Sequence, residues 1–126
     1  MKLMDELVFN DQGMIPVIIA NVENNRPLTL CYMTREALEK TLETGKVHVF
    51  RRSQGRLMLK GETSGHVQEV RRVFVDCEGK SLLLLVRQRV AGCHHGYFSC
   101  YFREYDRDKD EFAIVEERVF DPQKVY

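Results

Sequence analysis

The chain has 126 residues, of which 44% are hydrophobic and 30% are charged, and its 19 basic residues balance its 19 acidic residues. This composition predicts one globular domain over residues 1–126 and argues against disorder. Without a basic excess the chain lacks the charge for sequence-independent binding of nucleic acid, and its apolar runs are too short to cross a bilayer.

The beginning of the chain does not have the pattern of a secretory signal. It turns acidic at Asp5 and Glu6, where a signal peptide would continue with apolar residues. We therefore expect a cytoplasmic protein, with no membrane partner. In that compartment thiols stay reduced, so the four cysteines are expected to be ligands, nucleophiles or core residues.

Eight strands and one helix are expected along the chain. Apolar and β-branched runs bounded by turn residues predict strands at residues 16–22, 28–33, 47–52, 56–60, 67–76, 81–90, 100–105 and 112–118. Thr34 as N-cap and Gly45 as C′ residue bound the one main helix, over residues 34–44. Cys31, inside a predicted strand, is expected in the core. The predicted fold class is α+β, a mostly β roll or barrel-like sheet with one helix.

Three cysteines form a candidate metal centre. Cys93 and Cys100 enclose a short segment with two histidines and a glycine, and Cys77 precedes them. Three thiolates can hold Zn²⁺ and leave its fourth tetrahedral position open, as in catalytic sites. Two alternatives stay open: the cysteines are simply buried, or His94 or His95 closes a structural site.

Residues 60–65 have the composition of an anion-binding loop. They combine small residues, hydroxyl groups and a lysine, and an Arg-Arg-Ser segment precedes them in the predicted hairpin. Side chains of both segments are therefore candidate phosphate ligands. The candidates are Arg52, Ser53, Lys60, Glu62, Thr63 and Ser64. A solvated β-turn is the alternative that composition alone favours.

Five blocks in chain order resemble the phosphoribosyl-AMP cyclohydrolases of histidine biosynthesis. The blocks cover residues 9–16, 32–38, 59–68, 76–78 and 93–100. The resemblance implies a hydrolase that opens the N1–C6 bond of the adenine ring in the nucleotide phosphoribosyl-AMP and needs zinc and magnesium. It also implies an intertwined homodimer with one zinc per subunit, held by Cys93 and Cys100 of one chain and Cys77 of its partner.

The resemblance also suggests roles for residues near these ligands. His94, beside a zinc ligand, is the expected general acid or base, whereas His95 stands where the family has threonine and is not expected to be catalytic. Magnesium is implied at Asp76 and Glu78, but Lys80 stands where the family has a third carboxylate. An ammonium beside two carboxylates carries the same net charge as three carboxylates with Mg²⁺, so we hypothesise that Lys80 replaces this ion.

Two further departures keep other functions open. Phe50 and Met58 stand at two tryptophan positions of the family, and the chain has no tryptophan. One alternative is a paralogous zinc hydrolase acting on another purine-like nucleotide. The other is a non-catalytic module whose fold is stabilised by a structural zinc ion. The pyrophosphohydrolase domain that is fused to some family members is not expected, because the sequence ends at Tyr126.

Overall fold

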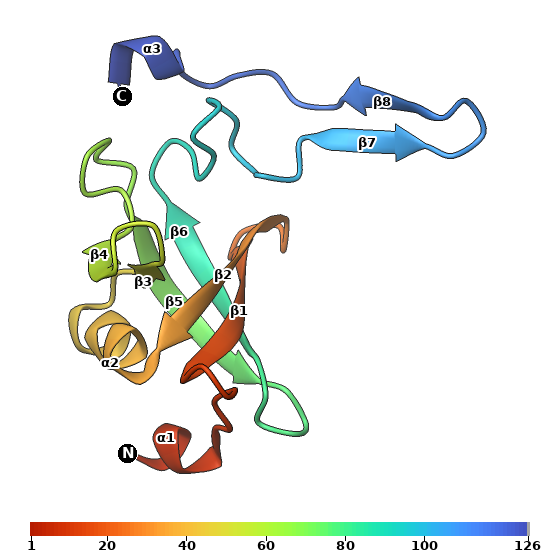
Figure 1. The fold of residues 1–126 in the computed structure, drawn as a ribbon. Coiled ribbons are helices and arrows are strands. Elements are labelled where there is room, and N and C mark those ends of the chain that lie inside the picture. The colour runs from red at the N-terminus through yellow and green to blue at the C-terminus, as the bar shows by residue number, and fades with distance from the viewer. Residues whose placement is uncertain (126) are drawn as a thin grey trace.

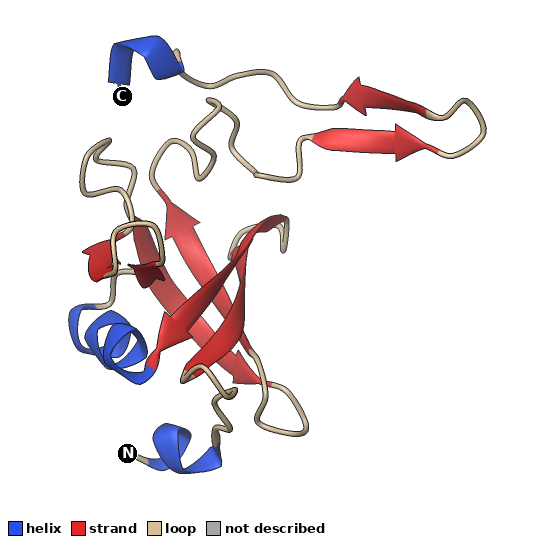
Figure 2. Cartoon of the chain, in the orientation of Figure 1, coloured by secondary structure: helices blue, strands red, loops and turns tan. Residues whose placement is uncertain are grey.

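The computed structural model describes residues 1–125 and contains more strand than helix (Figures 1 and 2). The helices are α1 (Lys2–Glu6), α2 (Arg35–Thr44) and α3 (Pro122–Val125). The strands are β1 (Met14–Asn21), β2 (Pro27–Thr34), β3 (His48–Arg51), β4 (Arg56–Leu59), β5 (Gln68–Val75), β6 (Leu82–Gln88), β7 (Arg103–Asp106) and β8 (Glu111–Ile114). The predicted α+β class is confirmed. No helix in this part of the chain has the length and apolar character needed to cross a membrane.

A four-stranded sheet in the order β2-β1-β6-β5 forms the centre of the molecule. β1 pairs antiparallel with β2 and parallel with β6, and β5 pairs antiparallel with β6. β3 with β4 and β7 with β8 form two separate hairpins, of which β7–β8 projects from the body (Figure 1). Over residues 1–125 none of these sheets closes on itself, so the barrel-like closure is not confirmed.

One face of the sheet forms the core. On β1, Ile15, Val17 and Ile19 are fully buried, and Ala37 and Leu38 of α2 belong to the same cluster. The helix begins and ends as predicted. The Thr34 hydroxyl accepts a hydrogen bond from the backbone N–H of Ala37 at 3.1 Å, and the C-cap residue after Thr44 is a left-handed glycine.

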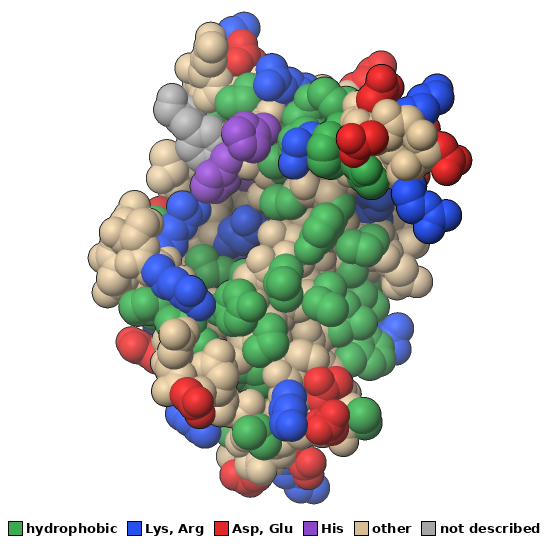
Figure 3. All heavy atoms as spheres, turned by 45° about the vertical axis from the view of Figure 1, so that its right-hand side comes forward, with side chains coloured by type: hydrophobic (Ala, Val, Ile, Leu, Met, Phe, Trp, Pro, Cys, Tyr) green, Lys and Arg blue, Asp and Glu red, His purple; other side chains and the backbone are tan. Residues whose placement is uncertain are grey.

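The opposite face of the sheet carries a row of apolar side chains. The cross-strand register aligns Leu30, Ile18, Leu83 and Phe74, one from each strand of the sheet. Leu30, Ile18 and Phe74 are between 40% and 48% exposed. A space-filling view shows hydrophobic side chains gathered over the middle of one side of the molecule (Figure 3). An apolar area of this kind is typical of a surface that another molecule covers.

The strand predictions fail mainly after residue 88. β6 ends at Gln88, because Val90 adopts a left-handed backbone with φ of 70° that a strand cannot continue through. The strand expected from residue 100 begins only at Arg103, because Cys100 instead donates its N–H to the carbonyl of Leu28 at 2.7 Å. The last strand is shorter than predicted, and the short helices α1 and α3 were not predicted.

Candidate active site

The chain after β6 folds into a tight loop over residues 91–100, here called the cysteine loop. Gly92 N–H donates to the carbonyl of Phe98 at 3.1 Å, and Cys93 N–H donates to the carbonyl of Tyr97 at 3.2 Å. The bond from Cys100 to Leu28 fixes the end of this loop to β2. These backbone bonds return the chain on itself and bring the Cys93 and Cys100 side chains to the same cavity, which has a volume of about 760 Å³.

The two thiols of the cysteine loop are close neighbours. Cys93 is only 5% exposed, and the Cys100 thiol interacts with it directly. Burial raises the pKa of the Cys93 thiol, and the hydrogen bond from the backbone N–H of His95 to Cys93 Sγ, at 3.4 Å, acts in the opposite direction. Backbone N–H groups that point at sulfur stabilise the thiolate form, which is the form that binds a metal.

Cys77 lies far from this pair within one chain. It follows β5, in the turn that leads into β6, whereas the cysteine loop follows the opposite end of β6 (Figure 1). Among residues 1–125, no three His, Cys, Asp or Glu side chains are close enough together to hold a metal ion. One chain therefore brings together two of the three predicted ligands, and the contribution of Cys77 stays a prediction that needs a second chain.

Cys31 packs against the hydrophobic core, as predicted. Burial raises the pKa of its thiol to about 12, although the neighbouring Lys60 ammonium lowers it. Cys31 is distinguished from Cys93 and Cys100 by its position, because it does not line their cavity.

Lys60 points toward the cysteine loop. Its Nζ donates to the carbonyl oxygen of Gly92 at 3.3 Å. Burial lowers the pKa of Lys60, and the nearby thiols of Cys100 and Cys31 oppose this shift. The ammonium therefore fixes the backbone immediately before Cys93 and supplies positive charge beside the thiols.

Of the other predicted phosphate ligands, some lie next to the cavity and some lie away from it. Glu62, Thr63 and Ser64 line a small hollow beside the cavity, together with Arg51 and His94. Within this group, Glu62 forms an ion pair with Arg56 at 3.0 Å, so its carboxylate already has a cationic partner.

Arg52 and Ser53 do not line the cavity of the cysteines. The Arg52 guanidinium instead lies 5.4 Å from the centre of the Tyr32 ring, and Ser53 is exposed in the β3–β4 turn. The residue that faces the cavity is Arg51, which lines both it and the neighbouring hollow. Arg51 is the last residue of β3, whereas Arg52, which was predicted to belong to the strand, already lies in the turn.

His94 contacts Arg51 at the edge of the cavity. The distance from Arg51 Nη2 to His94 Nε2 is 3.2 Å. Because a guanidinium can only donate, Nε2 accepts, and the imidazole is neutral with its proton on Nδ1. Burial lowers the pKa of His94, and the charges of Arg51 and Lys60 lower it further.

The cavity is strongly basic. Arg51, Lys60, Arg103 and Arg118 line it, and no Asp or Glu is among the lining residues. Such a cavity favours an anionic ligand with more than one phosphate or carboxylate group. Sequence reasoning missed Arg103 and Arg118, because they lie after the last recognisable motif and reach the cavity only through long-range folding.

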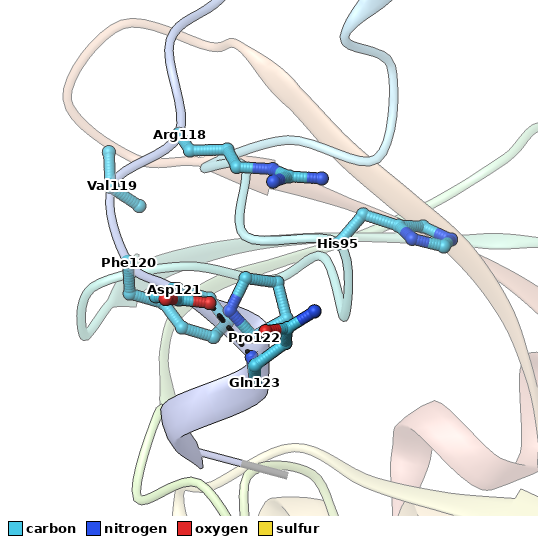
Figure 4. A pocket seen from close by; sticks show the side chains of 7 residues that line it. All are labelled: His95, Arg118, Val119, Phe120, Asp121, Pro122 and Gln123. Atoms are coloured by element: carbon cyan, nitrogen blue, oxygen red, sulfur yellow. Dashed lines mark hydrogen bonds between the residues drawn. The ribbon is translucent and has the colours of Figure 1, made fainter.

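Residues 116–122, here called the C-terminal strap, lie across the cysteine loop. Glu116 forms an ion pair with Arg26, and Val119 N–H donates to the carbonyl of Gly96 at 2.7 Å. Gly96 adopts φ of 96°, and a Cβ atom there would lie 2.6 Å from the Phe120 carbonyl oxygen. Only glycine therefore allows the strap to approach the loop this closely. Figure 4 shows residues of the strap around a hollow that His95 also lines.

The His66 ring packs edge-on against Phe120 of the strap, with 4.7 Å between the ring centroids. Burial followed by the charge of Arg89 lowers the pKa of His66 from 6.5. The unfolded chain therefore binds a proton more readily than the folded one, so protonation destabilises the fold. We expect the melting temperature to fall as the pH drops below about 6.5, and His66→Phe to reduce this fall. Equal pH dependence of thermal unfolding in both proteins would contradict this role.

The acidic block lies beside Cys77. Asp76 Oδ1 accepts hydrogen bonds from the N–H groups of Glu78 and Lys80, both at 2.9 Å, and Oδ2 accepts from the Ser81 hydroxyl at 2.6 Å. These hydrogen bonds lower the pKa of Asp76, and the bond from the Ser81 hydroxyl contributes most to this shift. The Lys80 ammonium pairs with the Glu78 carboxylate at 3.2 Å, although both side chains are largely exposed.

Comparison with known proteins gives one consistent result. The model of the family described as phosphoribosyl-AMP cyclohydrolase matches residues 29–102. A phosphoribosyl-AMP cyclohydrolase of Chloroherpeton thalassium is 42% identical over 125 residues, covering 99% of this chain and 89% of the relative. Another, of Nitratidesulfovibrio vulgaris, is 47% identical over 116 residues, covering 90% of each chain. The histidine biosynthesis bifunctional protein HisIE of Thermoanaerobacter pseudethanolicus is 45% identical over 125 residues, which are 99% of this chain but only 57% of that protein.

Proposed function

The chain belongs to the phosphoribosyl-AMP cyclohydrolase family, whose members are hydrolases of histidine biosynthesis, and from this we propose that it opens the adenine ring of phosphoribosyl-AMP by hydrolysis of the N1–C6 bond. The observation that carries the proposal is the cavity in which two cysteines and His94 lie among basic residues. The substrate has two phosphate groups, and the absence of carboxylates among the lining residues suits its charge.

We propose that zinc is bound by Cys93 and Cys100 of one chain and Cys77 of its partner. The adjacent thiols of the cysteine loop, with a backbone N–H directed at Cys93 Sγ, are soft donors suited to this ion. Zinc with three thiolate ligands supplies Lewis acidity that makes water a nucleophile at neutral pH. The Lys60 ammonium offsets the net negative charge of one Zn²⁺ ion with three thiolates, and its bond to Gly92 keeps the loop in place.

His94 is the proposed general acid or base. As a general acid, its neutral ring can give the Nδ1 proton to the departing N1, whereas it can take a proton from water only after Nε2 has released Arg51. Arg51 holds the ring by one nitrogen, which fixes its orientation toward the cavity. The nearby Phe102 ring, which lines the same cavity, provides an apolar surface against which the adenine ring can stack.

The homodimer is proposed from the outer face of the sheet. The apolar row of Leu30, Ile18, Leu83 and Phe74 leads to a hollow of about 270 Å³, which Asp76 also lines. A second copy covering this row would bury exposed apolar surface. It would also contact the turn that carries Cys77. The same association would complete the zinc site, which one chain leaves with two thiols.

Magnesium is not needed at the acidic block in this proposal. Both oxygens of Asp76 already accept hydrogen bonds, and Lys80 supplies the positive charge beside Glu78. We expect chelation with EDTA followed by replacement of zinc alone to restore full activity, and added Mg²⁺ to raise it less than twofold, about the error of the assay. Lys80→Asp, which restores a third carboxylate, is expected to acquire a response to Mg²⁺. A strict magnesium requirement in the unaltered protein would contradict the hypothesis that Lys80 replaces Mg²⁺.

The proposed reaction is tested by incubating the purified protein with phosphoribosyl-AMP and following ring opening by absorbance. Turnover that depends on zinc supports the proposal. Expression of the gene in a histidine auxotroph lacking the cyclohydrolase provides the second test, and rescue is expected. A zinc-containing protein that neither turns over the substrate nor rescues growth would favour a paralogous hydrolase or a structural module instead.

A further inference from the structure

We propose that Arg118 of the C-terminal strap binds one of the two phosphate groups of the substrate, where the cavity of the cysteines meets the hollow beneath the strap. The inference rests on the proposed function and adds a residue that lies beyond the part of the chain matching the family model, residues 29–102. Arg118 lines the cavity of the cysteines and also the hollow beneath the strap (Figure 4).

The strap holds Arg118 between two attachments. On one side Glu116 forms an ion pair with Arg26, and on the other Val119 donates to the carbonyl of Gly96. An arginine placed between two fixed residues loses less conformational freedom on binding than one in a free tail. The position of Arg118 is therefore a property of the fold.

Aromatic packing further orients the side chain. The Arg118 guanidinium lies over the Tyr97 ring, 5.7 Å from its centroid, and Tyr97 stacks on Phe102 with 3.8 Å between centroids. Tyr97 is itself buried, so it is a firm support. A guanidinium held over an aromatic ring by a cation–π contact still has N–H groups with which it can bind a phosphate through two parallel hydrogen bonds.

Arg51 and Arg118 each line a different hollow next to the cavity of the cysteines. The hollow at the anion loop shares Arg51 and His94 with the cavity, and the hollow beneath the strap shares His95 and Arg118 with it. These two pairs have no residue in common. A substrate with a phosphate at each end matches this arrangement better than a substrate with a single phosphate does.

The strap contains three carboxylates, Glu116, Glu117 and Asp121, and none of them lines the cavity of the cysteines. Asp121 lines only the hollow beneath the strap, and its Oδ1 accepts a hydrogen bond from the N–H of Gln123 at 3.0 Å. We therefore assign the phosphate to the side of Arg118 that faces the cysteines, where no lining residue is acidic.

The test combines variants with truncated substrates. Arg118→Gln, Arg118→Lys and the control Arg107→Gln, which removes the same charge from the exposed β7–β8 turn, are assayed with phosphoribosyl-AMP and with its two analogues that each lack one phosphate. We expect Arg118→Gln to lower kcat/KM for the full substrate about 10- to 100-fold, mainly by raising KM, because one charge-assisted contact is lost. Arg118→Lys should recover part of this loss, and Arg107→Gln should lower kcat/KM less than about twofold.

The analogues decide the assignment. Arg118→Gln should leave kcat/KM unchanged for the analogue that lacks the phosphate bound at residue 118, and lower it for the other one. Equal losses on both analogues and the full substrate, or no loss on any, would overturn the subsite. Thermal unfolding of each variant shows whether a loss comes from the fold. If the unaltered protein does not turn over phosphoribosyl-AMP, the proposed function is wrong. If it is active but replacement of Arg118 does not change kcat/KM, only the assignment of Arg118 is wrong.

Discussion

Replacing Cys93 or Cys100 by serine is expected to lower kcat/KM by about 10³-fold or more, because a site with two remaining thiolates loses the Lewis acidity on which water activation depends. Serine has nearly the size of cysteine, so the backbone bonds of the cysteine loop should survive, and each variant should unfold at about the same temperature as the metal-free unaltered protein. The measurements are kcat/KM for phosphoribosyl-AMP and zinc content by mass spectrometry. Both should fall together in each variant.

Cys31→Ala is the matched control for these variants. Cys31 is the fourth cysteine and does not line the cavity, so its replacement should leave zinc content and kcat/KM close to those of the unaltered protein. Some stability is lost, since the side chain packs against the core. Full activity in Cys93→Ser and Cys100→Ser would show that the neighbouring thiols of the cysteine loop are structural.

Co-expression of two inactive variants should restore activity if the zinc site is shared between subunits. A Cys77→Ala chain keeps Cys93 and Cys100, and a Cys93→Ala chain keeps Cys77, so a mixed dimer contains one complete site. Random pairing makes about half of the dimers mixed, and we expect about one quarter of the normal specific activity. The physical basis is the separation of Cys77 from the cysteine loop by the length of β6 within one chain.

The control pair for this experiment is Cys93→Ala with Cys100→Ala. Both replacements fall on the same half of the site, so no pairing of these chains produces a complete set of three thiols. We expect no recovery of activity from this pair. Recovery in both mixtures, or in neither, would contradict a site built from two subunits.

Local features of the fold were predictable from sequence. Thr34 and Gly45 define the ends of α2 through bonds between residues three or four apart, and the turn at residues 53–55 defines the β3–β4 hairpin in the same way. Such local chemistry acts wherever it occurs in a chain. The adjacency of Cys93 and Cys100 was also foreseeable, since only six residues separate them.

The remainder of the site depends on contacts between distant residues. Arg118 reaches the cavity because Glu116 pairs with Arg26, 90 positions earlier in the chain. The inward orientation of Arg51, and not Arg52, depends on how β3 packs. No local pattern encodes either contact, so composition and spacing could place basic residues near the motifs but could not select those that line the cavity.

X-ray absorption at the zinc edge, recorded on the active protein, tests the shared three-thiolate centre most directly. The account predicts about three sulfur atoms near 2.3 Å and one lighter atom per zinc, with one sulfur lost in Cys77→Ser. An active protein without bound transition metal, or a zinc spectrum that Cys77→Ser leaves unchanged, would contradict it.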